Sequence, residues 1–292
     1  MVKYSYTHLD EFFVLSQWKD DVKGPFGLHP PPGDWASFKA KIEALNDQCP
    51  PGESVKVIFA ARHGQAEHNA IMDKPHSNAI RTDVIYRLCH QAQVKYPMLD
   101  PDLTPLGRSQ AYETRLALQR EIQRGMPIPT KWFVSPLKRA GETCGIEWGF
   151  MFADGYDIDG GGYTGGKGHG VRATVIENIR EHLHVHLCDA RCPISTLKAQ
   201  FTSFTYPAEI TDEDTLWQPI DVRGRETEEE LVARRGEGIR EILERSQGDT
   251  YISLTAHSGS LRGIYKSLNV IPRKVIVGEM NVLVIRVKEI QD

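Results

Sequence analysis

The feature of this sequence that most constrains its fold is an unbroken apolar run that ends in an arginine and a histidine. The stretch 57–61 reads VIFAA, and Arg62, His63 and Gly64 follow it directly. An apolar run without alternation is typical of a parallel strand that is covered on both faces. Because open α/β sheets bind their ligands beyond the carboxyl ends of the strands, Arg62 and His63 are predicted to lie at a ligand site.

The same succession of strand, loop and helix recurs along the chain. Short apolar strands are predicted at 132–134, 173–176 and 251–256, with one or two closing strands within 275–287. Apolar residues at helical spacing predict helices at 35–46, 82–96, 105–124, 223–244 and 259–268, and one after Pro136. Asp34 and Thr104 are suited to cap two of these helices. The pattern predicts an α/β fold with a mainly parallel central sheet flanked by helices on both faces.

Charge and composition exclude several classes of partner. The 35 Lys and Arg residues against 39 Asp and Glu residues give a net charge of −4, so neither a nucleic-acid nor a membrane partner is expected. The first residues lack a basic segment followed by an apolar core, and no apolar stretch is long enough to span a membrane. The five sparse cysteines suit a reducing compartment. We expect a cytoplasmic protein, with the nucleus as an alternative.

Three downstream segments give the Arg62–His63 pair a specific meaning. They are SPLKRAGET at 135–143, REHLHVHLCDAR from Arg180, and AHSGSLR at 256–262. With the first motif, their order and spacing resemble the histidine phosphatase superfamily, the phosphoglycerate-mutase-like fold group. The resemblance covers about residues 54–287 and is strongest to the phosphoglycerate-mutase-like proteins of fungi and plants. No glycine-rich phosphate loop of the P-loop type is expected in the chain.

The resemblance implies a domain organisation. Residues 1–53 would form an N-terminal arm and helix packed on the core, and 54–292 a histidine-phosphatase-like catalytic domain, a single domain overall. Met1 to Gly33 is aromatic and then proline-rich, and we expect an extended arm on the domain surface. The glycine-rich stretch 153–170 is predicted to be an exposed loop, with a lid over the site as the alternative.

The motifs supply the residue types that phosphomonoester chemistry needs. Such a site has to neutralise the phosphoryl oxygens, supply an in-line nucleophile and protonate a poor leaving group. By resemblance, His63 is the nucleophile, Glu181 is the proton donor, and the phosphoryl group binds to Arg62, Arg139 and His257. We expect His257 to be protonated. The remaining substrate-binding candidates are Asn69 and the backbone amides of Ser258 and Gly259.

Several alternatives stay open in the segment after Ile176. Glu177 lies one helical turn before Glu181 and competes with it as the proton donor. In a strand, a period of two would place His182, His184 and His186 on one face, a spacing compatible with a zinc site and a metallohydrolase. Asp189 and Arg191 are expected to pair with each other or to shape the substrate pocket, and Glu142 and Thr143 to have structural roles.

These residues together predict a metal-independent phosphatase that hydrolyses a small phosphomonoester through a phosphohistidine on His63. No cofactor is expected, and the partner would be a small phosphorylated metabolite. The alternatives are a phosphomutase of the phosphoglycerate-mutase type and a catalytically silent binding scaffold. The insertions at 71–97, 150–170 and 188–217, which would build the leaving-group side, do not single out a substrate.

Overall fold

The computed structural model describes residues 2–15, 25–28, 34–72, 99–152, 170–184 and 186–290. The helix expected at 82–96 and nearly all of the glycine-rich loop expected at 153–170 lie outside these residues. Within the described part of the chain, no helix is long and apolar enough to cross a membrane.

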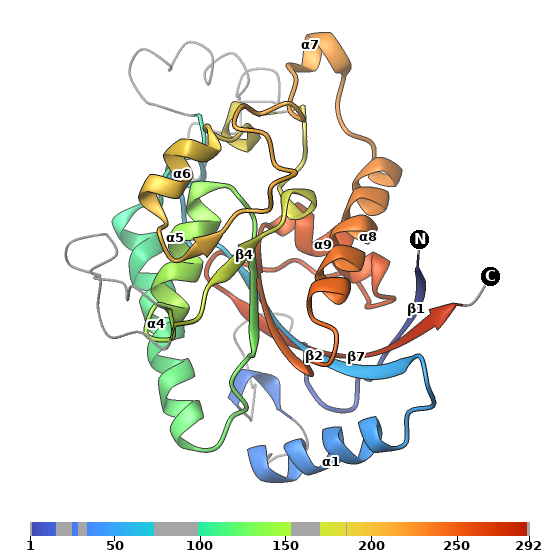
Figure 1. The fold of residues 1–292 in the computed structure, drawn as a ribbon. Coiled ribbons are helices and arrows are strands. Elements are labelled where there is room, and N and C mark those ends of the chain that lie inside the picture. Colours follow the sequence, from blue (N-terminus) through green and yellow to red (C-terminus); the bar gives the residue numbers. More distant parts are fainter. Residues whose placement is uncertain are drawn as a thin grey trace.

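One seven-stranded sheet organises the molecule, in the order β1-β7-β2-β6-β3-β4-β5 (Figure 1). Its strands are β1 (Lys3–His8), β2 (Glu53–Arg62), β3 (Lys131–Val134), β4 (Ala173–Val175), β5 (Phe204–Thr205), β6 (Tyr251–Ala256) and β7 (Met280–Ile290). The strands from β2 through β6, β3 and β4 to β5 are parallel to their neighbours, and β7 is antiparallel to both β2 and β1. The predicted mainly parallel sheet is confirmed.

Helices cover both faces of this sheet. They are α1 (Trp35–Asp47), α2 (Glu67–Met72), α4 (Pro105–Gln123), α5 (Lys138–Trp148), α6 (Ile194–Gln200), α7 (Ile220–Arg223), α8 (Glu228–Arg245) and α9 (Ser258–Ser267), with short 3-10 turns η1 (Pro25–Gly27), η4 (Glu177–Ile179) and η5 (Leu187–Asp189). Val57 and Phe59 of β2 pack in one core cluster with α1, α4 and α5. Ile58 and Ala60 pack on the opposite face with α8 and α9. This two-sided burial explains why β2 reads as an unbroken apolar run.

Polar side chains begin the helices where the sequence predicts caps. The Asp34 carboxylate accepts the backbone N–H of Ser37 at 2.7 Å, and the Thr104 hydroxyl accepts that of Gly107 at 3.0 Å. The helix predicted at 223–244 is wrong at its start, because α8 begins at Glu228. Gly224 has a φ of 81°, which ends α7 before Thr227 caps α8.

Both ends of the described chain contribute a strand to the sheet. Residues 3–8 are extended and at most half-buried, as expected of the arm, and they pair with β7 as the edge strand of the sheet. Phe12 and Phe13 are buried in the core cluster against α1. At the other end, the predicted closing region is one strand of 11 residues that starts at Met280. Both ends thus belong to the antiparallel side of the sheet.

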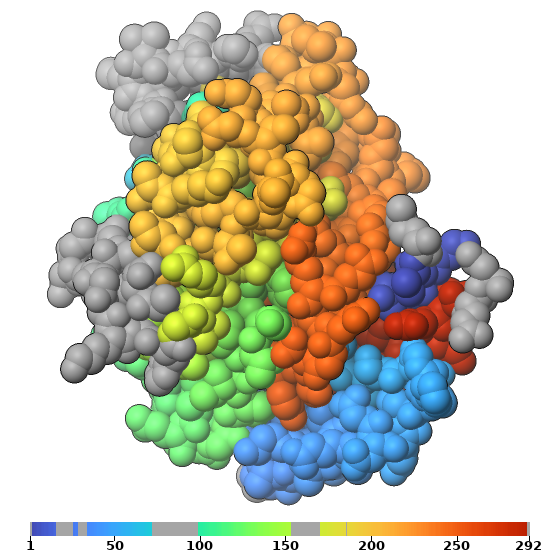
Figure 2. Space-filling view, in the orientation of Figure 1, coloured from blue at the N-terminus to red at the C-terminus, as the bar shows by residue number. Residues whose placement is uncertain are grey.

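The register of the parallel strands brings distant motifs to one edge. Arg62 at the end of β2 pairs with Ala256 at the end of β6, and Val134 of β3 pairs with Thr255. The residues that follow these three strands therefore emerge together. In the space-filling view, the yellow and gold atoms of residues 187–223 lie over the upper half of the molecule, above α4 and α5 (Figure 2).

Candidate active site

His63 and His257 leave the carboxyl ends of two neighbouring strands and face each other. The backbone N–H of His63 donates to the carbonyl of Ala256 at 3.0 Å, which continues the β2–β6 ladder by one residue. The two imidazole rings are 5.0 Å apart between centroids. The first and last sequence motifs, about 190 residues apart, thus lie side by side at one site, as the resemblance implies.

The environment of His63 fixes its protonation state. The side chain is 2% exposed, and Nδ1 lies 2.7 Å from the carbonyl oxygen of Gly64. A carbonyl only accepts, so Nδ1 carries the proton and Nε2 keeps its lone pair. Burial, with Arg139 and Arg62 nearby, holds the pKa of His63 well below its ordinary value. His63 is thus a neutral imidazole with one nitrogen available as a nucleophile.

Close backbone contacts hold the loop that carries His63. A Cβ on Gly64 would lie 2.3 Å from the carbonyl oxygen of Gly107 at the start of α4, so a side chain does not fit there. The Gly64 N–H donates to the Thr143 hydroxyl at 3.0 Å, and that hydroxyl donates to the Arg139 carbonyl at 2.8 Å. Thr143 has the structural role predicted for it, since it ties the loop to α5.

Glu142 also has a structural role. Its carboxylate accepts the backbone N–H of Leu103 at 3.0 Å and pairs with Arg108 at 2.5 Å. These contacts join α5 to the segment that leads into α4. Glu142 therefore fixes the helices behind the site.

Arg139 is the most deeply buried cation of the site. Its exposed fraction is 0%, and its guanidinium donates to the Cys188 carbonyl at 2.6 Å and to Asp189 Oδ1 at 2.8 Å. Its Nε–H is buried and has no hydrogen-bond partner among the described residues. The expected pairing of Asp189 with Arg191 is wrong, because Asp189 pairs with Arg139 and Arg191 pairs with Glu177.

Arg62 and Asn69 lie on either side of His63 in sequence. Arg62 is half-buried and donates through Nη1 to the Val275 carbonyl at 2.8 Å. Asn69, in the first turn of α2, accepts the Ala66 N–H through Oδ1 at 3.0 Å. This contact orients the Asn69 amide with its oxygen toward the backbone.

The Ser135 hydroxyl holds the imidazole of His257. Its Nε2 lies 2.7 Å from the Ser135 hydroxyl, which also accepts the Leu137 N–H at 3.4 Å. Ser135 can donate its own proton to Nε2, and in that tautomer the imidazole proton lies on Nδ1. That Nδ1 is buried without a partner among the described residues.

The expected protonation of His257 is wrong for the ligand-free protein. The side chain is fully buried, and burial together with Arg139 and His63 lowers the pKa of His257 well below its ordinary value. The group is therefore a neutral hydrogen-bond donor. The positive charge of the site resides on its arginines.

Glu181 lies at the N-terminus of α9, next to His257. One carboxylate oxygen accepts the Gly259 N–H at 2.9 Å and the Ser258 hydroxyl at 3.3 Å, and the other accepts the His182 N–H at 3.0 Å. Burial raises the pKa of Glu181, but His182, the Gly259 amide and Arg235 outweigh it, so the pKa lies below its ordinary value. In the ligand-free protein the Gly259 amide therefore binds Glu181, where the sequence suggested a phosphate.

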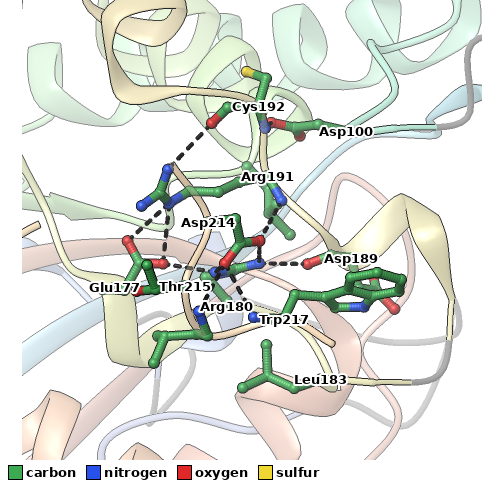
Figure 3. Close-up of polar contacts among 12 residues, drawn as sticks. Asp100, Glu177, Arg180, Leu183, Asp189, Arg191, Cys192, Asp214, Thr215 and Trp217 are labelled. Carbon is green, nitrogen blue, oxygen red and sulfur yellow. Dashed lines mark hydrogen bonds and ion pairs between the residues drawn. The ribbon is translucent and has the colours of Figure 1, made fainter. Parts of the chain in front are cut away.

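The rival proton donor is committed to other contacts. Glu177 pairs with Arg180 at 2.7 Å and with Arg191 at 3.2 Å, within the buried network drawn in Figure 3. Glu181 instead contacts the residues directly after His257. The geometry favours Glu181 as the acid of this site.

The histidines of the zinc hypothesis do not share a strand face. Residues 182–184 form irregular backbone, and His184 has a φ of 70°. His184 Nδ1 accepts the Gln218 N–H at 3.0 Å, whereas His182 Nε2 accepts from Arg262 at 3.2 Å. In the part of the chain that the structure describes, no three His, Cys, Asp or Glu side chains are grouped to hold a metal ion. The premise of that hypothesis is therefore wrong.

Three side chains without a predicted catalytic or phosphate-binding role lie at the site. Ser135 contacts His257, and Asp189 contacts Arg139. The ring centroid of His68 lies 6.0 Å from that of His63. Burial, Arg139 and Arg62 lower the pKa of His68 well below its ordinary value. His68 directly precedes Asn69 in the first motif, but nothing in its spacing distinguishes it from an ordinary loop histidine.

Comparison with known proteins places the chain among relatives of one kind. No protein-family model matches the chain. It is 27% identical over 237 residues to a probable phosphoglycerate mutase of Arthroderma benhamiae, across 81% of this chain and 64% of that relative. It is 29% identical over 231 residues to a phosphoglycerate mutase-like protein of Arabidopsis thaliana, across 74% of this chain and 76% of the relative. The resemblance to phosphoglycerate-mutase-like proteins of fungi and plants is confirmed.

The chain spans somewhat less than two thirds of the length of the fungal phosphoglycerate-mutase-like relative. Among solved structures, it is similar to the ecdysone phosphate phosphatase from Bombix mori in complex with tungstate. That similarity has a TM-score of 0.46 at 17% identity, over 78% of this chain and 90% of the other.

Proposed function

We propose that the chain is a metal-independent phosphatase that hydrolyses a small phosphomonoester through a phosphohistidine intermediate on His63. The observation that carries the proposal is the combination of a neutral His63 with an unprotonated Nε2 and two buried donors beside it. These donors, Arg139 Nε–H and His257 Nδ1, have no partner among the described residues. Phosphoryl oxygens bound beside His63 would give both donors a partner.

The first half-reaction transfers the phosphoryl group to the protein. His63 Nε2 attacks phosphorus, the bond from phosphorus to the leaving oxygen breaks, and Glu181 gives its proton to that oxygen. The bound dianion raises the pKa of Glu181 by like-charge repulsion, so the carboxyl group can hold a proton when the substrate is present. The products of this step are a free alcohol and a phosphohistidine.

The second half-reaction returns the protein to its starting state. A water molecule attacks phosphorus, the Glu181 carboxylate accepts one of its protons, and the nitrogen–phosphorus bond breaks. Inorganic phosphate leaves, His63 regains its Nε2 lone pair, and Glu181 is protonated again. Every proton is thus returned within one turnover.

Charge stabilisation in both steps comes from the protein. The planar guanidinium groups of Arg62 and Arg139 suit the equatorial phosphoryl oxygens. Neutral His257 adds a donor at Nδ1, and Asn69 adds its amide N–H₂, because Oδ1 is already bound to the Ala66 N–H. We assign the charge neutralisation that a metal ion supplies in other phosphatases to these groups.

A phosphomutase is the second candidate, and the names of the relatives favour it. The names of both the fungal and the plant relative contain the words phosphoglycerate mutase. A mutase shares the first half-reaction but returns the phosphoryl group to a bound acceptor in place of water. The two candidates therefore differ in the second step alone.

The test measures phosphate release from an aryl phosphate and from phosphoglycerates, with a chelator present throughout. The variants are His63→Ala and, as a matched control, His8→Ala on the edge strand β1, far from the site. We expect release by the wild type and by His8→Ala and none by His63→Ala. Isomerisation of phosphoglycerate without release would replace hydrolysis by the mutase reaction, and activity that needs added metal would overturn the metal-independent mechanism.

A further inference from the structure

We propose that Asp189 is a positioning residue that holds the Arg139 guanidinium in the orientation in which it binds the phosphoryl group. The inference rests on the proposed function, since it assigns Arg139 to the phosphoryl group. Two consecutive residues accept hydrogen bonds from the guanidinium. Nη1 donates to the Cys188 carbonyl at 2.6 Å and Nη2 to the Asp189 carboxylate at 2.8 Å. Because guanidinium is planar, two such contacts fix its plane.

These two hydrogen bonds leave other N–H donors of Arg139 available to a ligand. A guanidinium has five N–H donors, of which these contacts use two. The Nε–H is buried and has no partner among the described residues. Asp189 therefore orients Arg139 without occupying the donors that an anion would take.

Burial raises the pKa of Asp189 to about 7 despite the Arg139 guanidinium beside it, and in its ionised form Asp189 balances the charge of Arg139 before substrate binds. The side chains of Arg139 and Asp189 are 0% and 4% exposed, so Arg139 alone would be an uncompensated buried cation. A buried charge without a partner of opposite charge is strongly destabilising. A carboxylate beside a phosphoryl site repels an anionic substrate. The presence of Asp189 there is explained if the carboxylate holds Arg139 in place.

The backbone that carries Asp189 is itself anchored by buried ionic groups (Figure 3). Arg180 donates to the Asp189 carbonyl at 2.8 Å and pairs with Asp214 at 2.6 Å. Asp214 in turn accepts the Arg191 N–H at 2.9 Å. The backbone is thus fixed on both sides of Ala190, which limits where the Asp189 carboxylate can lie.

A further carboxylate joins this segment to the helix that carries Arg139. Asp100, which is fully buried, accepts the Lys138 N–H at 2.8 Å and the Cys192 N–H at 3.1 Å. Asp100 therefore sets the distance between the start of α5 and the segment that holds Asp189. Buried contacts therefore fix both the start of the helix that carries Arg139 and the segment that carries Asp189.

The experiment compares Asp189→Asn and Asp189→Ala with wild type. Asp102→Ala is the matched control, because Asp102 pairs with Lys138, the residue before Arg139, at 2.9 Å but is 49% exposed. Two quantities are measured: kcat and KM with an aryl phosphate, and the affinity for orthovanadate by calorimetry, which needs no turnover. Circular dichroism establishes that each variant is folded.

Positioning predicts an ordered result. Asparagine keeps an oxygen that accepts from Arg139 Nη2 but loses the charge, so Asp189→Asn should unfold more easily than wild type, while the kcat/KM of the folded variant stays within about threefold of wild type. Asp189→Ala should lose about 10–100-fold in kcat/KM and in orthovanadate affinity, the range known for residues that orient a ligand-binding group. Asp102→Ala should match wild type.

Three results would overturn the inference. Retention of wild-type kcat/KM and orthovanadate affinity by Asp189→Ala would show that Arg139 needs no positioning. An equal loss in both variants would indicate that Asp189 transfers a proton, and tighter orthovanadate binding in both would indicate repulsion alone.

If Asp189→Ala does not fold, Asp189→Asn decides, because near wild-type values support positioning and a loss of more than about tenfold contradicts it.

Failure of the proposed function would be seen separately. A wild type that hydrolyses no phosphomonoester but binds orthovanadate would remove the phosphatase assignment, and the orthovanadate series would still test Asp189. A wild type that does not bind orthovanadate would overturn both.

Discussion

The carboxylate of Glu181 accepts the backbone N–H of Gly259 at 2.9 Å, so the proposed acid caps the helix that follows His257. A Cβ on Gly259 would lie 2.2 Å from Glu181 Oε1 and 2.6 Å from a ring carbon of His182. The absence of a side chain at residue 259 is therefore what allows the acid to approach α9. The position of Glu181 depends on a glycine that takes no part in proton transfer.

Replacing this glycine should displace the acid. In Gly259→Ala we expect kcat/KM for an alkyl phosphate to fall by about 10²-fold, since small displacements of a reacting group have effects of that size. Steady-state kinetics measure the loss. The matched control is Gly236→Ala within α8, where the nearest atom to a new Cβ is 4.0 Å away. That control should keep its activity and unfold at a higher temperature, and equal losses in both variants would contradict the explanation.

Leaving-group chemistry separates Glu181 as an acid from Glu181 as a helix cap. Glutamine keeps an oxygen for the Gly259 N–H but has no acidic proton. Glu181→Gln should therefore lower kcat for alkyl phosphates by about 10²–10⁴-fold, while aryl phosphates with acidic leaving groups lose much less. The measurement is kcat for a series of phosphomonoesters of graded leaving-group pKa. A uniform loss across the series would point to a structural role.

The Ser135 hydroxyl should contribute both stability and activity through His257. Removing it leaves His257 Nε2 buried and unpaired, which costs about 1–3 kcal/mol of unfolding free energy. We expect Ser135→Ala to be destabilised by this amount in chemical denaturation and to lose about tenfold in kcat/KM, as a bond orienting a reactive group is lost. Ser253→Ala is the control, because Ser253 is equally buried and its hydroxyl has no partner among the described residues. A similar cost in the control would contradict the assignment.

The neutral histidines predict a loss of stability in acid. The pKa values of His63, His68 and His257 are all lowered well below the ordinary 6.5, with burial as the largest cause. The unfolded chain then binds more protons than the folded one below about pH 6.5, so the unfolding free energy falls as the pH drops. Each such group contributes up to about 1.4 kcal/mol per pH unit.

The measurement is chemical denaturation of wild type and His257→Asn between about pH 7 and 5.5, a range that spans the pKa of histidine in the unfolded chain. Burial raises the pKa of Glu147 well above its ordinary value, which acts in the opposite direction, so the difference between the two proteins is the informative quantity. The stability of His257→Asn should depend less steeply on pH than that of wild type. Parallel curves would show that His257 is not held neutral.

Sequence reasoning predicts the elements whose signals are local. The apolar run of β2 and the caps Asp34 and Thr104 depend on residues adjacent in the chain, and the structure confirms them. The edge strand β1 was missed because six alternating residues near a chain end gain their stability from pairing with β7. The start of α8 was misplaced because the break at Gly224 depends on a left-handed φ that charged neighbours do not signal.

The same distinction holds at the site. The sequence places His63 and His257 each at the end of a predicted strand, and the family resemblance implies that they share a site, which the structure shows. The partners of these groups could not be predicted, because Ser135 and Asp189 contact residues 122 and 50 positions away in the chain. The neutral state of His257 also depends on burial and on neighbours that the fold brings together.

The most direct test of the account is to trap the phosphorylated protein. Wild type and His63→Ala are mixed with an aryl phosphate, quenched at alkaline pH to preserve phosphohistidine, digested and analysed by mass spectrometry. We expect one phosphoryl group on the peptide that contains His63 in the wild type, and none on any histidine of His63→Ala. Turnover by the wild type with a phosphoryl group on another residue, or turnover that persists in His63→Ala, would contradict it.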